Sequence, residues 1–333
     1  MRRKMALTAL TILLVLLVYI LYELARVRWF PPPASSAGGA VVDSPAACSL
    51  QGHVERLSAG IGSRSVLEFE KIEETKRYIL GVLAGYGWSP EIQGFPYEGR
   101  MYGNVIATIA GEKSAAETVV VGAHYDTVTG TPGADDNASG VAVLLELSRL
   151  LRGIRPDRTI KLVFFCLEEP PVFRTPSMGS FVYAERAKAA GERIAAMISL
   201  EMLGYYGTAE GGQAFPLPFM SLFFRTTPDF IAVVGNLSSR HLVGDVAASL
   251  RETGMAVETL STVSLVPGVD FSDHRSFWKM GYPAVMLTDT AFYRNPHYHA
   301  SSDTIDTLDF RRMALLLDGL ERAVRRLCRS GPA

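Results

Sequence analysis

The sequence predicts an α/β fold, because one stretch of the chain follows the order strand, loop, helix, strand. Apolar runs of strand length occupy residues 118–123 and 159–167. Between them lie a loop rich in Gly, Pro and Asp and an amphipathic helical pattern that opens near residues 137–139. This order describes a βαβ unit. In open α/β sheets, ligands bind at the edge formed by the carboxyl ends of such strands.

Polar residues stand at the carboxyl ends of both predicted strands. They are His124 and Asp126 after the first run, Asp136 at the end of the loop, and Glu168 and Glu169 after the second run. Zinc accepts imidazole nitrogen and carboxylate oxygen as ligands, so these residues are candidates for a metal site. Asp126 is placed to accept the second ring N–H of His124 and to fix its tautomer. An ordinary polar loop is the alternative, and the paired glutamates argue against it.

Residues 1–30 are predicted to be a membrane anchor. They begin with three basic residues after Met1 and continue with an uncharged stretch at 5–22, which at about 1.5 Å per residue can cross a hydrocarbon core. A cleaved secretory signal is the alternative, but its apolar part is usually about 7–15 residues long. No small-x-small site directly follows the stretch, and Arg26 and Arg28 come next. The basic start favours a single span with a cytoplasmic N-terminus.

A spacer rich in Pro, Ala, Ser and Gly at 31–47 precedes the predicted catalytic domain, residues 48–333. The domain is therefore expected outside the cytoplasm, in the periplasm or the extracellular space. In an oxidising compartment a disulfide between Cys48 and Cys328 is possible, and the sequence leaves it open. Cys166 lies within an apolar run and is expected to pack in the core. The near balance of 33 basic and 34 acidic residues gives no indication of a nucleic-acid partner.

The remaining elements continue the mixture of helices and strands. The pattern predicts helices at 68–86, 238–253 and 308–328, and strands at 104–110, 195–200 and 230–235. The strand that ends at residue 200 delivers Glu201, for which metal binding is favoured over the burial of an unpaired carboxylate. An insertion rich in Pro and aromatic residues follows Glu169. It is either a surface loop or a segment that brings Phe173 over the site.

Five short motifs give the chain a resemblance to a known family. They are GAHYDTV at 122–128, GADDNASG at 133–140, the glutamate pair, ISLEM at 198–202, and His299 followed by three residues and then Asp303 and Thr304. Together they resemble the zinc-dependent exopeptidases of metallopeptidase family 28, which include bacterial leucyl aminopeptidases, glutamate carboxypeptidase II and glutaminyl cyclases. The motifs keep the family's order over residues 51–328. The last motif selects His299 over the neighbouring His297.

The resemblance implies a three-layer α/β/α sandwich with a central mixed, mostly parallel sheet, and two zinc ions about 3.5–4 Å apart. It implies five metal ligands: Asp136 as the bridge, His124 and Glu201 on one ion, and Glu169 and His299 on the other. The family commonly has Asp where this chain has Glu201, which is longer by one methylene. A cis peptide bond between Asp136 and Asn137 is also implied.

Roles for further residues come with the resemblance. Glu168 is expected to act as the general base, and Tyr298 to donate a hydrogen bond to the oxyanion, with packing as the alternative for Tyr298. Asp273, in a predicted polar loop with Asp270 and His274, resembles a carboxylate that lies behind the metal ligands or near the substrate. Loop capping is the alternative for Asp273. His274 is expected to be structural.

The expected activity is that of an aminopeptidase, which hydrolyses peptides with a free N-terminus. A glutaminyl cyclase is the first alternative, but cyclases tend to carry Trp where this chain has Tyr298. A non-catalytic binding protein is the second, and the filled ligand and base positions argue against it. Carboxypeptidase activity on acidic peptides is also open, although such relatives usually carry additional domains.

Overall fold

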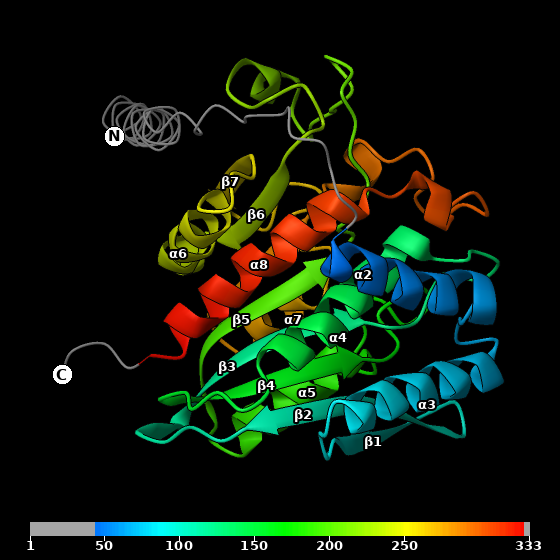
Figure 1. The fold of residues 1–333 in the computed structure, drawn as a ribbon, viewed down its shortest axis with the longest axis vertical. Helices are drawn as coiled ribbons and strands as arrows, with labels where there is room; N and C mark the ends of the chain where they lie inside the picture. The colour runs from blue at the N-terminus through cyan, green and yellow to red at the C-terminus, as the bar shows by residue number, and fades with distance from the viewer. Residues whose placement is uncertain (1–43, 330–333) are drawn as a thin grey trace, which may run out of the picture.

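The computed structural model describes residues 44–329, whose ribbon is shown in Figure 1. The predicted anchor at 1–30 lies outside the described residues, as does most of the predicted linker at 31–47. Within the described range, no helix is both long enough and apolar enough to cross a membrane. The described residues therefore cover almost the whole of the predicted catalytic domain.

The first described helix begins inside the predicted linker. Helix α2 runs over Pro45–Glu55, and the Oγ of Ser44 accepts a hydrogen bond from the backbone N–H of Ala47 at 3.1 Å. Ser is a favoured N-cap and Pro is favoured at the first helical position, so this Ser-Pro pair starts a helix although its composition resembles a spacer. A helix therefore occupies the last residues of the segment that the composition predicts to be a linker.

Among residues 44–329, an eight-stranded mixed sheet forms the middle layer, in the order β1-β2-β4-β3-β5-β8-β6-β7. The strands are β1 (Glu91–Tyr97), β2 (Arg100–Ile109), β3 (Ser114–His124), β4 (Arg158–Phe165), β5 (Arg193–Glu201), β6 (Ile231–Asn236), β7 (Val257–Thr262) and β8 (Ala284–Thr288). β4, β3, β5 and β8 are parallel neighbours, and β6 is parallel to β7. The β1–β2, β2–β4 and β6–β8 pairs are antiparallel. The sheet is therefore mixed and mostly parallel, as expected.

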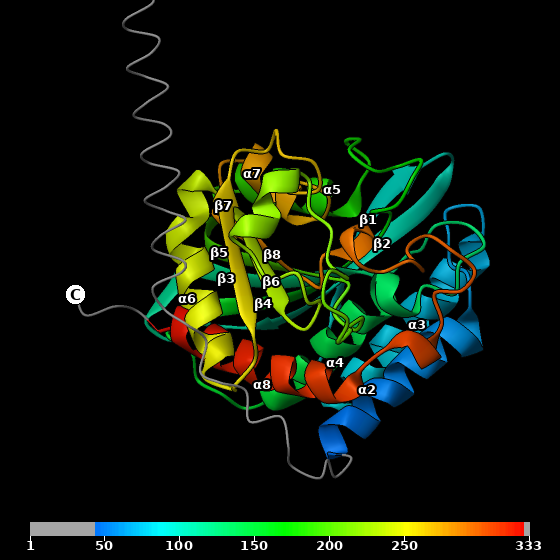
Figure 2. The same cartoon turned by 90° about the horizontal axis from the view of Figure 1, so that it is seen from above.

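Helices cover both faces of the sheet, which gives three layers (Figure 2). α2, α3 (Phe69–Gly85), α4 (Gly140–Leu150), α6 (Arg240–Arg251) and α8 (Phe310–Leu327) pack on one face, and α5 (Gly179–Ala189) and α7 (His274–Lys279) pack on the other. Short helical turns lie in the connections: η1 (Arg56–Ile61), η2 (Ala134–Ser139), η3 (Pro218–Leu222), η4 (Leu237–Ser239), η5 (Ala291–Tyr293) and η6 (Ile305–Thr307). Because side chains of a strand alternate, Val119 and Val121 of β3 enter the larger core and Val120 enters the smaller one.

Several elements form where none is predicted, among them β1, β7, β8 and α7. β1 and β7 lie at the two edges of the sheet. β1 contains Gly94 and Pro96, which an edge strand tolerates but which obscure a strand pattern. Asp270 and Asp273 lie in a loop as predicted, but α7 begins at His274, which the sequence predicts to belong to that loop. Phe277 of α7 is fully buried in the smaller core, and this packing stabilises a helix too short to show a periodic pattern.

The predicted βαβ unit is confirmed as β3, α4 and β4. His124, the last residue of β3, pairs in register with Phe165, the last residue of β4. On the other side of β3, the parallel strand β5 ends at Glu201. The carboxyl ends of three neighbouring strands therefore meet at one edge of the sheet, where ligands bind in folds of this kind.

All three cysteines of the chain are free thiols. Cys48 is exposed on α2, whereas Cys328 is buried just after α8. The disulfide that the sequence leaves open is therefore not formed in the structure. Cys166 is buried in the larger core, as expected.

Candidate active site

Five polar side chains from distant parts of the chain converge at the carboxyl edge of the sheet. His124 ends β3, Glu169 follows β4, Glu201 ends β5, Asp136 lies in η2, and His299 lies in the loop before η6. Four of these residues are buried, and the side chain of His299 is 29% exposed. The structure thus brings together all the residues that the resemblance implies as metal ligands.

The distances divide these groups into two sets joined at Asp136. The Nε2 atom of His124 lies 3.4 Å from Asp136 Oδ1 and 3.4 Å from Glu201 Oε2. The Nε2 atom of His299 lies 3.2 Å from Asp136 Oδ2 and 3.4 Å from Glu169 Oε2. Each set therefore contains one imidazole nitrogen and two carboxylate oxygens, and the two oxygens of one carboxylate serve different sets.

Several of these atoms lack a hydrogen-bond partner in the described part of the chain. His124 Nε2, Asp136 Oδ1 and Glu169 Oε1 are buried and unpartnered. The ligand atoms of these three residues all lie within 4.8 Å of one another. Buried polar atoms without partners are costly, and bound cations would supply the missing partners. The donor set, imidazole nitrogen with carboxylate oxygen, fits zinc.

The electrostatics of the cluster also fit a bound cation. Burial raises the pKa of Glu169 to about 8, and the negative charge of Asp136 adds to this shift. Burial likewise raises the pKa of Glu168 well above its usual range. Burial alone would lower the pKa of His299, but contacts with the carboxylates of Asp136 and Glu169 raise it to about 10. Several acids thus share one buried space, and a divalent cation would relieve their mutual repulsion.

Asp126 holds the backbone of the glutamate pair. Its Oδ1 accepts a hydrogen bond from the N–H of Glu168 at 3.0 Å, and its Oδ2 accepts one from the N–H of Glu169 at 3.1 Å. The Nδ1 atom of His124 lies 3.2 Å from the carbonyl oxygen of Asp126 and 3.6 Å from Asp126 Oδ1. The hydrogen bond that orients His124 therefore goes to the carbonyl of Asp126 and not, as the sequence predicts, to its carboxylate.

Asp303 does the same for the loop that carries Asp136. Its Oδ1 accepts a hydrogen bond from the N–H of Asp135 at 2.9 Å, and its Oδ2 accepts one from the N–H of Asp136 at 3.1 Å. The peptide bond between Asp136 and Asn137 is cis, as the resemblance implies. Asp303 is part of the quoted motif, but its spacing from His299 reveals no role. Only the fold shows that it binds these backbone groups.

Arg64 is a functional-site residue that the sequence does not reveal. Its side chain is fully buried and donates hydrogen bonds to the carbonyl oxygens of Tyr125, Pro132 and Gly133 at 2.8, 2.7 and 2.8 Å. These carbonyls belong to the connection between β3 and η2, so Arg64 fixes the path from His124 to Asp136. An arginine among Gly and Ser residues gives no pattern that would predict burial.

Ser272 and Asp273 lie behind Glu201. The Oγ of Ser272 donates a hydrogen bond to Glu201 Oε2 at 2.8 Å, which orients that carboxylate. Asp273 is fully buried, and burial raises its pKa to about 7. Its side chain makes no capping hydrogen bond to α7, so the alternative of a loop cap is not supported. His274 Nε2 donates to the carbonyl oxygen of Val269 at 2.8 Å, in keeping with a structural role.

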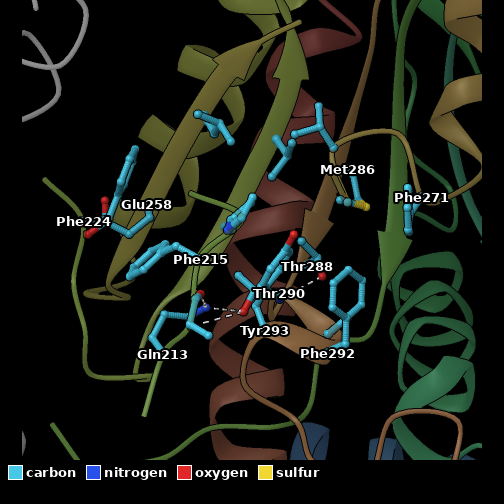
Figure 3. Close-up of a pocket in the computed structure, with 18 of the residues that line it drawn as sticks. Gln213, Phe215, Phe224, Glu258, Phe271, Met286, Thr288, Thr290, Phe292 and Tyr293 are labelled. Atoms are coloured by element: carbon cyan, nitrogen blue, oxygen red, sulfur yellow. Dashed lines mark hydrogen bonds between the residues drawn. The ribbon is translucent and has the colours of Figure 1, made fainter. Parts of the chain in front are cut away.

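An apolar pocket adjoins the cluster, and Glu201 and Tyr298 lie between the two. Phe215 and Phe224 line one side of the pocket, and Phe271 and Phe292 line the other (Figure 3). Its wall on the sheet is formed by Ala232 and Val234 of β6, Leu260 of β7, and Met286 and Thr288 of β8.

The ring of Tyr298 stacks on His299 with centroids 3.7 Å apart. By contrast, His297 Nδ1 lies 2.9 Å from the Oγ of Ser302 and is not part of the cluster.

The comparison with protein families settles the relationship. The model of peptidase family M28 matches residues 104–320, which is more than half of the chain. The chain belongs to peptidase family M28. It is 41% identical over 281 residues to the uncharacterized protein YfbL of Escherichia coli (strain K12), covering 81% of this chain and 85% of YfbL. The family thus agrees with the resemblance carried by the motifs.

Other relatives of this M28 peptidase include named peptidases. A probable leucine aminopeptidase of Trichophyton verrucosum (strain HKI 0517) is 30% identical over 228 residues, which is 63% of this chain and 53% of the fungal protein. Among solved structures, BSAP, a zinc aminopeptidase from Bacillus subtilis, has a TM-score of 0.67 at 15% identity over 87% of this chain and 97% of that one. Tannerella forsythia glutaminyl cyclase has a TM-score of 0.61 at 20% identity, covering 86% and 99%. At these identities the structures show a shared α/β fold.

Proposed function

We propose that this M28 peptidase is a two-zinc aminopeptidase that removes N-terminal residues from peptides. The observation that carries the proposal is the position of Asp136, whose two oxygens face the two imidazoles of His124 and His299 at 3.4 and 3.2 Å. A carboxylate placed in this way suits a bridge between two ions. His124 and Glu201 would hold one zinc ion, and His299 and Glu169 the other.

Zinc, when bound, supplies Lewis acidity, which lowers the pKa of water and polarises a carbonyl. The remaining steps fall to residues of the chain. Glu168 belongs to neither ligand pair, is buried beside Glu169, and has its backbone held by Asp126. In the proposed mechanism Glu168 takes a proton from the attacking water and returns it to the leaving amine.

Tyr298 completes the proposed chemistry. Its ring is half-buried and stacked on His299, at the boundary between the ligand cluster and the apolar pocket. From this position its hydroxyl would donate a hydrogen bond to the oxygen that becomes negatively charged as water adds to the peptide carbonyl. The stacking on His299 also fits the alternative role of Tyr298 in packing, and the two roles do not exclude each other.

The pocket supplies a reason to expect apolar N-terminal residues in the substrate. Its walls are aromatic and aliphatic, and Glu201 joins it to the ligand cluster. A peptide bound with its first carbonyl at the cluster would place its first side chain in this pocket, where burial of apolar surface favours binding. Leucine, methionine and phenylalanine are therefore the expected N-terminal residues.

The membrane anchor remains part of the proposal. Residues 5–22 are uncharged and long enough to cross a bilayer, and basic residues precede them. We propose that they hold the catalytic domain at the outer side of the cytoplasmic membrane, in the periplasm or the extracellular space. Peptides in that compartment would be the substrates.

The test uses the purified full chain in mild detergent, loaded with zinc and mixed with peptides that begin with Leu, Phe, Ala or Gln. Mass spectrometry identifies the products. Loss of one N-terminal residue, abolished by a chelator, would support the aminopeptidase. Glu168→Gln should keep its zinc while kcat falls by about 10²–10⁴-fold, because only proton transfer is removed.

Other products would change the assignment. Loss of ammonia alone from the Gln peptide would identify a glutaminyl cyclase, the activity named for one structural neighbour. A Glu168→Gln variant that retains its rate would remove Glu168 as the base. Intact peptides in every sample would contradict the aminopeptidase.

A further inference from the structure

The insertion between β4 and α5 places Arg174 at the rim of the site. The N–H of Phe173 donates a hydrogen bond to the carbonyl oxygen of Glu169 at 3.2 Å, so the insertion folds back on a proposed metal ligand. The ring of Phe173 meets that of Phe271 edge-on at 5.9 Å, and Phe271 lines the apolar pocket. The guanidinium of Arg174 lies 4.7 Å from the ring of Phe271. The insertion thus contacts the pocket wall through Phe173 and Arg174.

A continuous row of aromatic rings connects this rim to the ligand cluster. Phe271 contacts Phe292 at 6.0 Å between centroids, Phe292 contacts Tyr298 at 5.4 Å, and Tyr298 stacks on His299. Figure 3 shows Phe271 and Phe292 on the same side of the pocket. A peptide that leaves the cluster along this side has an apolar surface to lie on and Arg174 at its end.

Arg174 carries positive charge that its neighbours do not balance. It donates from Nη2 to Asp270 Oδ1, while the Nε of Arg275 donates to Asp270 Oδ2 at 3.0 Å. Two guanidinium groups therefore share one carboxylate. The Nε and Nη1 of Arg174 donate no hydrogen bond to any residue of the described range, and the side chain is 39% exposed. The side chain of Asp270 is only 11% exposed.

We propose that Arg174 forms a subsite for a carboxylate of the peptide substrate, on the side of the chain that follows the cleaved bond. The inference rests on the proposed aminopeptidase function. The first side chain and the free amine occupy the pocket and the cluster, so only the rest of the peptide can reach the rim. A planar guanidinium with free N–H groups matches a carboxylate, and Asp270 and the two phenylalanine rings hold it in place before binding.

Two sources can supply this carboxylate. One is the C-terminus of a short peptide, and the other is an acidic side chain near the cleaved bond. The test measures kcat/KM of the full-length, zinc-loaded protein for Leu-Ala, Leu-Ala-Ala and Leu-Ala-Ala-Ala, each as free acid and as C-terminal amide. Leu-Asp-amide and Leu-Asn-amide form the second arm.

If the carboxylate is the C-terminus of the peptide, kcat/KM for the free acid should exceed kcat/KM for the amide by about tenfold at one of the three peptide lengths. This is the range of a charge-assisted contact at a partly exposed site. If the carboxylate is an acidic side chain, kcat/KM for Leu-Asp-amide should instead exceed kcat/KM for Leu-Asn-amide. Added salt at about 0.5 M should reduce either preference, since the contact is partly exposed. This salt dependence needs no variant and so does not depend on how a variant folds.

The variants assign the preference to one residue. In Arg174→Gln the acid-to-amide ratio should fall to about one, and Arg174→Lys should keep part of it, because charge remains without the planar fork. Arg322→Gln is the matched control, since it breaks an exposed ion pair with Asp318 on α8 and should keep the wild-type ratio. Equal rates for acids and amides, or the same ratio in wild type and Arg174→Gln, would overturn the subsite while leaving the aminopeptidase intact. Absence of all cleavage would overturn both.

Discussion

The ligand cluster and the apolar pocket meet at Glu201, yet they are built from different kinds of segment. The cluster takes most of its groups from the ends of parallel strands, and two further carboxylates, Asp126 and Asp303, hold the intervening backbone. The outer walls of the pocket come from the long connections around η3 and η5. The difference teaches that the proposed chemistry lies at the ends of parallel strands, whereas the choice of substrate depends on a sheet wall together with loops, which tolerate change.

The largest expected effect breaks the cluster. In His124→Ala, one of the two ligand sets loses its imidazole, and the buried carboxylates of Asp136 and Glu201 lose the group that faces them. Zinc content measured by mass spectrometry should fall by at least one ion per chain, and activity should fall to background. His297→Ala is the control, because His297 contacts Ser302 outside the cluster. Full zinc occupancy in His124→Ala would contradict the proposed ligands.

A smaller effect tests whether the pocket can change without the cluster. Ala232 of β6 lines the pocket, so Ala232→Phe would fill space that the first side chain is proposed to occupy. The ratio of kcat/KM for Leu-first over Ala-first peptides should fall by about 10–100-fold, with zinc content unchanged. Ala189→Phe, at the exposed end of α5, is the matched control. If the Leu-to-Ala ratio of kcat/KM is unchanged in Ala232→Phe, the pocket does not bind the first side chain of the substrate.

The smallest effect concerns stability and leaves both halves of the site alone. Glu146 on α4 accepts hydrogen bonds from Ser49, Tyr86 and Arg149 and lies 3.3 Å from Nε2 of His53. Burial would raise the pKa of Glu146, but these partners lower it to about 2, below its ordinary value of 4.5. The ionised form therefore stabilises the folded state at and above about pH 4.5. That contribution is lost as pH falls toward 2.

Denaturant unfolding of Glu146→Gln and wild type at several pH values checks this. The variant should be less stable by about 2 kcal/mol near neutral pH, and the difference should shrink between pH 4.5 and pH 2. The Leu-to-Ala preference and the zinc content should match those of wild type. A difference that stays constant across this pH range would mean that the charge of Glu146 is not what stabilises the fold.

The part of the site that the sequence predicts is the part next to strong local patterns. His124 directly follows one apolar run and the pair Glu168 and Glu169 follows the other, so the βαβ pattern alone places them at one edge of the sheet. The division of the ligands into two sets came only with the family resemblance. The distances around Asp136 agree with that division.

The remainder depends on tertiary contacts that no local pattern encodes. Arg64 is buried because carbonyl groups of another segment surround it, although arginine usually lies at the surface. Phe215 and Phe224 line the pocket from a connection without helical or strand periodicity, so their side of the pocket has no signature in the sequence. β7 escapes prediction for a related reason, since an edge strand with mostly half-buried residues shows no clean alternation.

The hydrogen bonds of Asp303 have a consequence for the order in which the protein becomes functional. Asp303 and the N–H of Asp135 are separated by 168 residues, and His299 lies in the same late segment. At about 5–20 residues per second, a ribosome reaches Asp303 roughly 10–30 s after the loop that it closes. Once residue 201 has been made, the nascent chain has the proposed general base and four of the five proposed ligands, but it still lacks His299 and the brace of Asp303. We infer that the candidate site stays incomplete, and the protein inactive, until residue 303 has been synthesised.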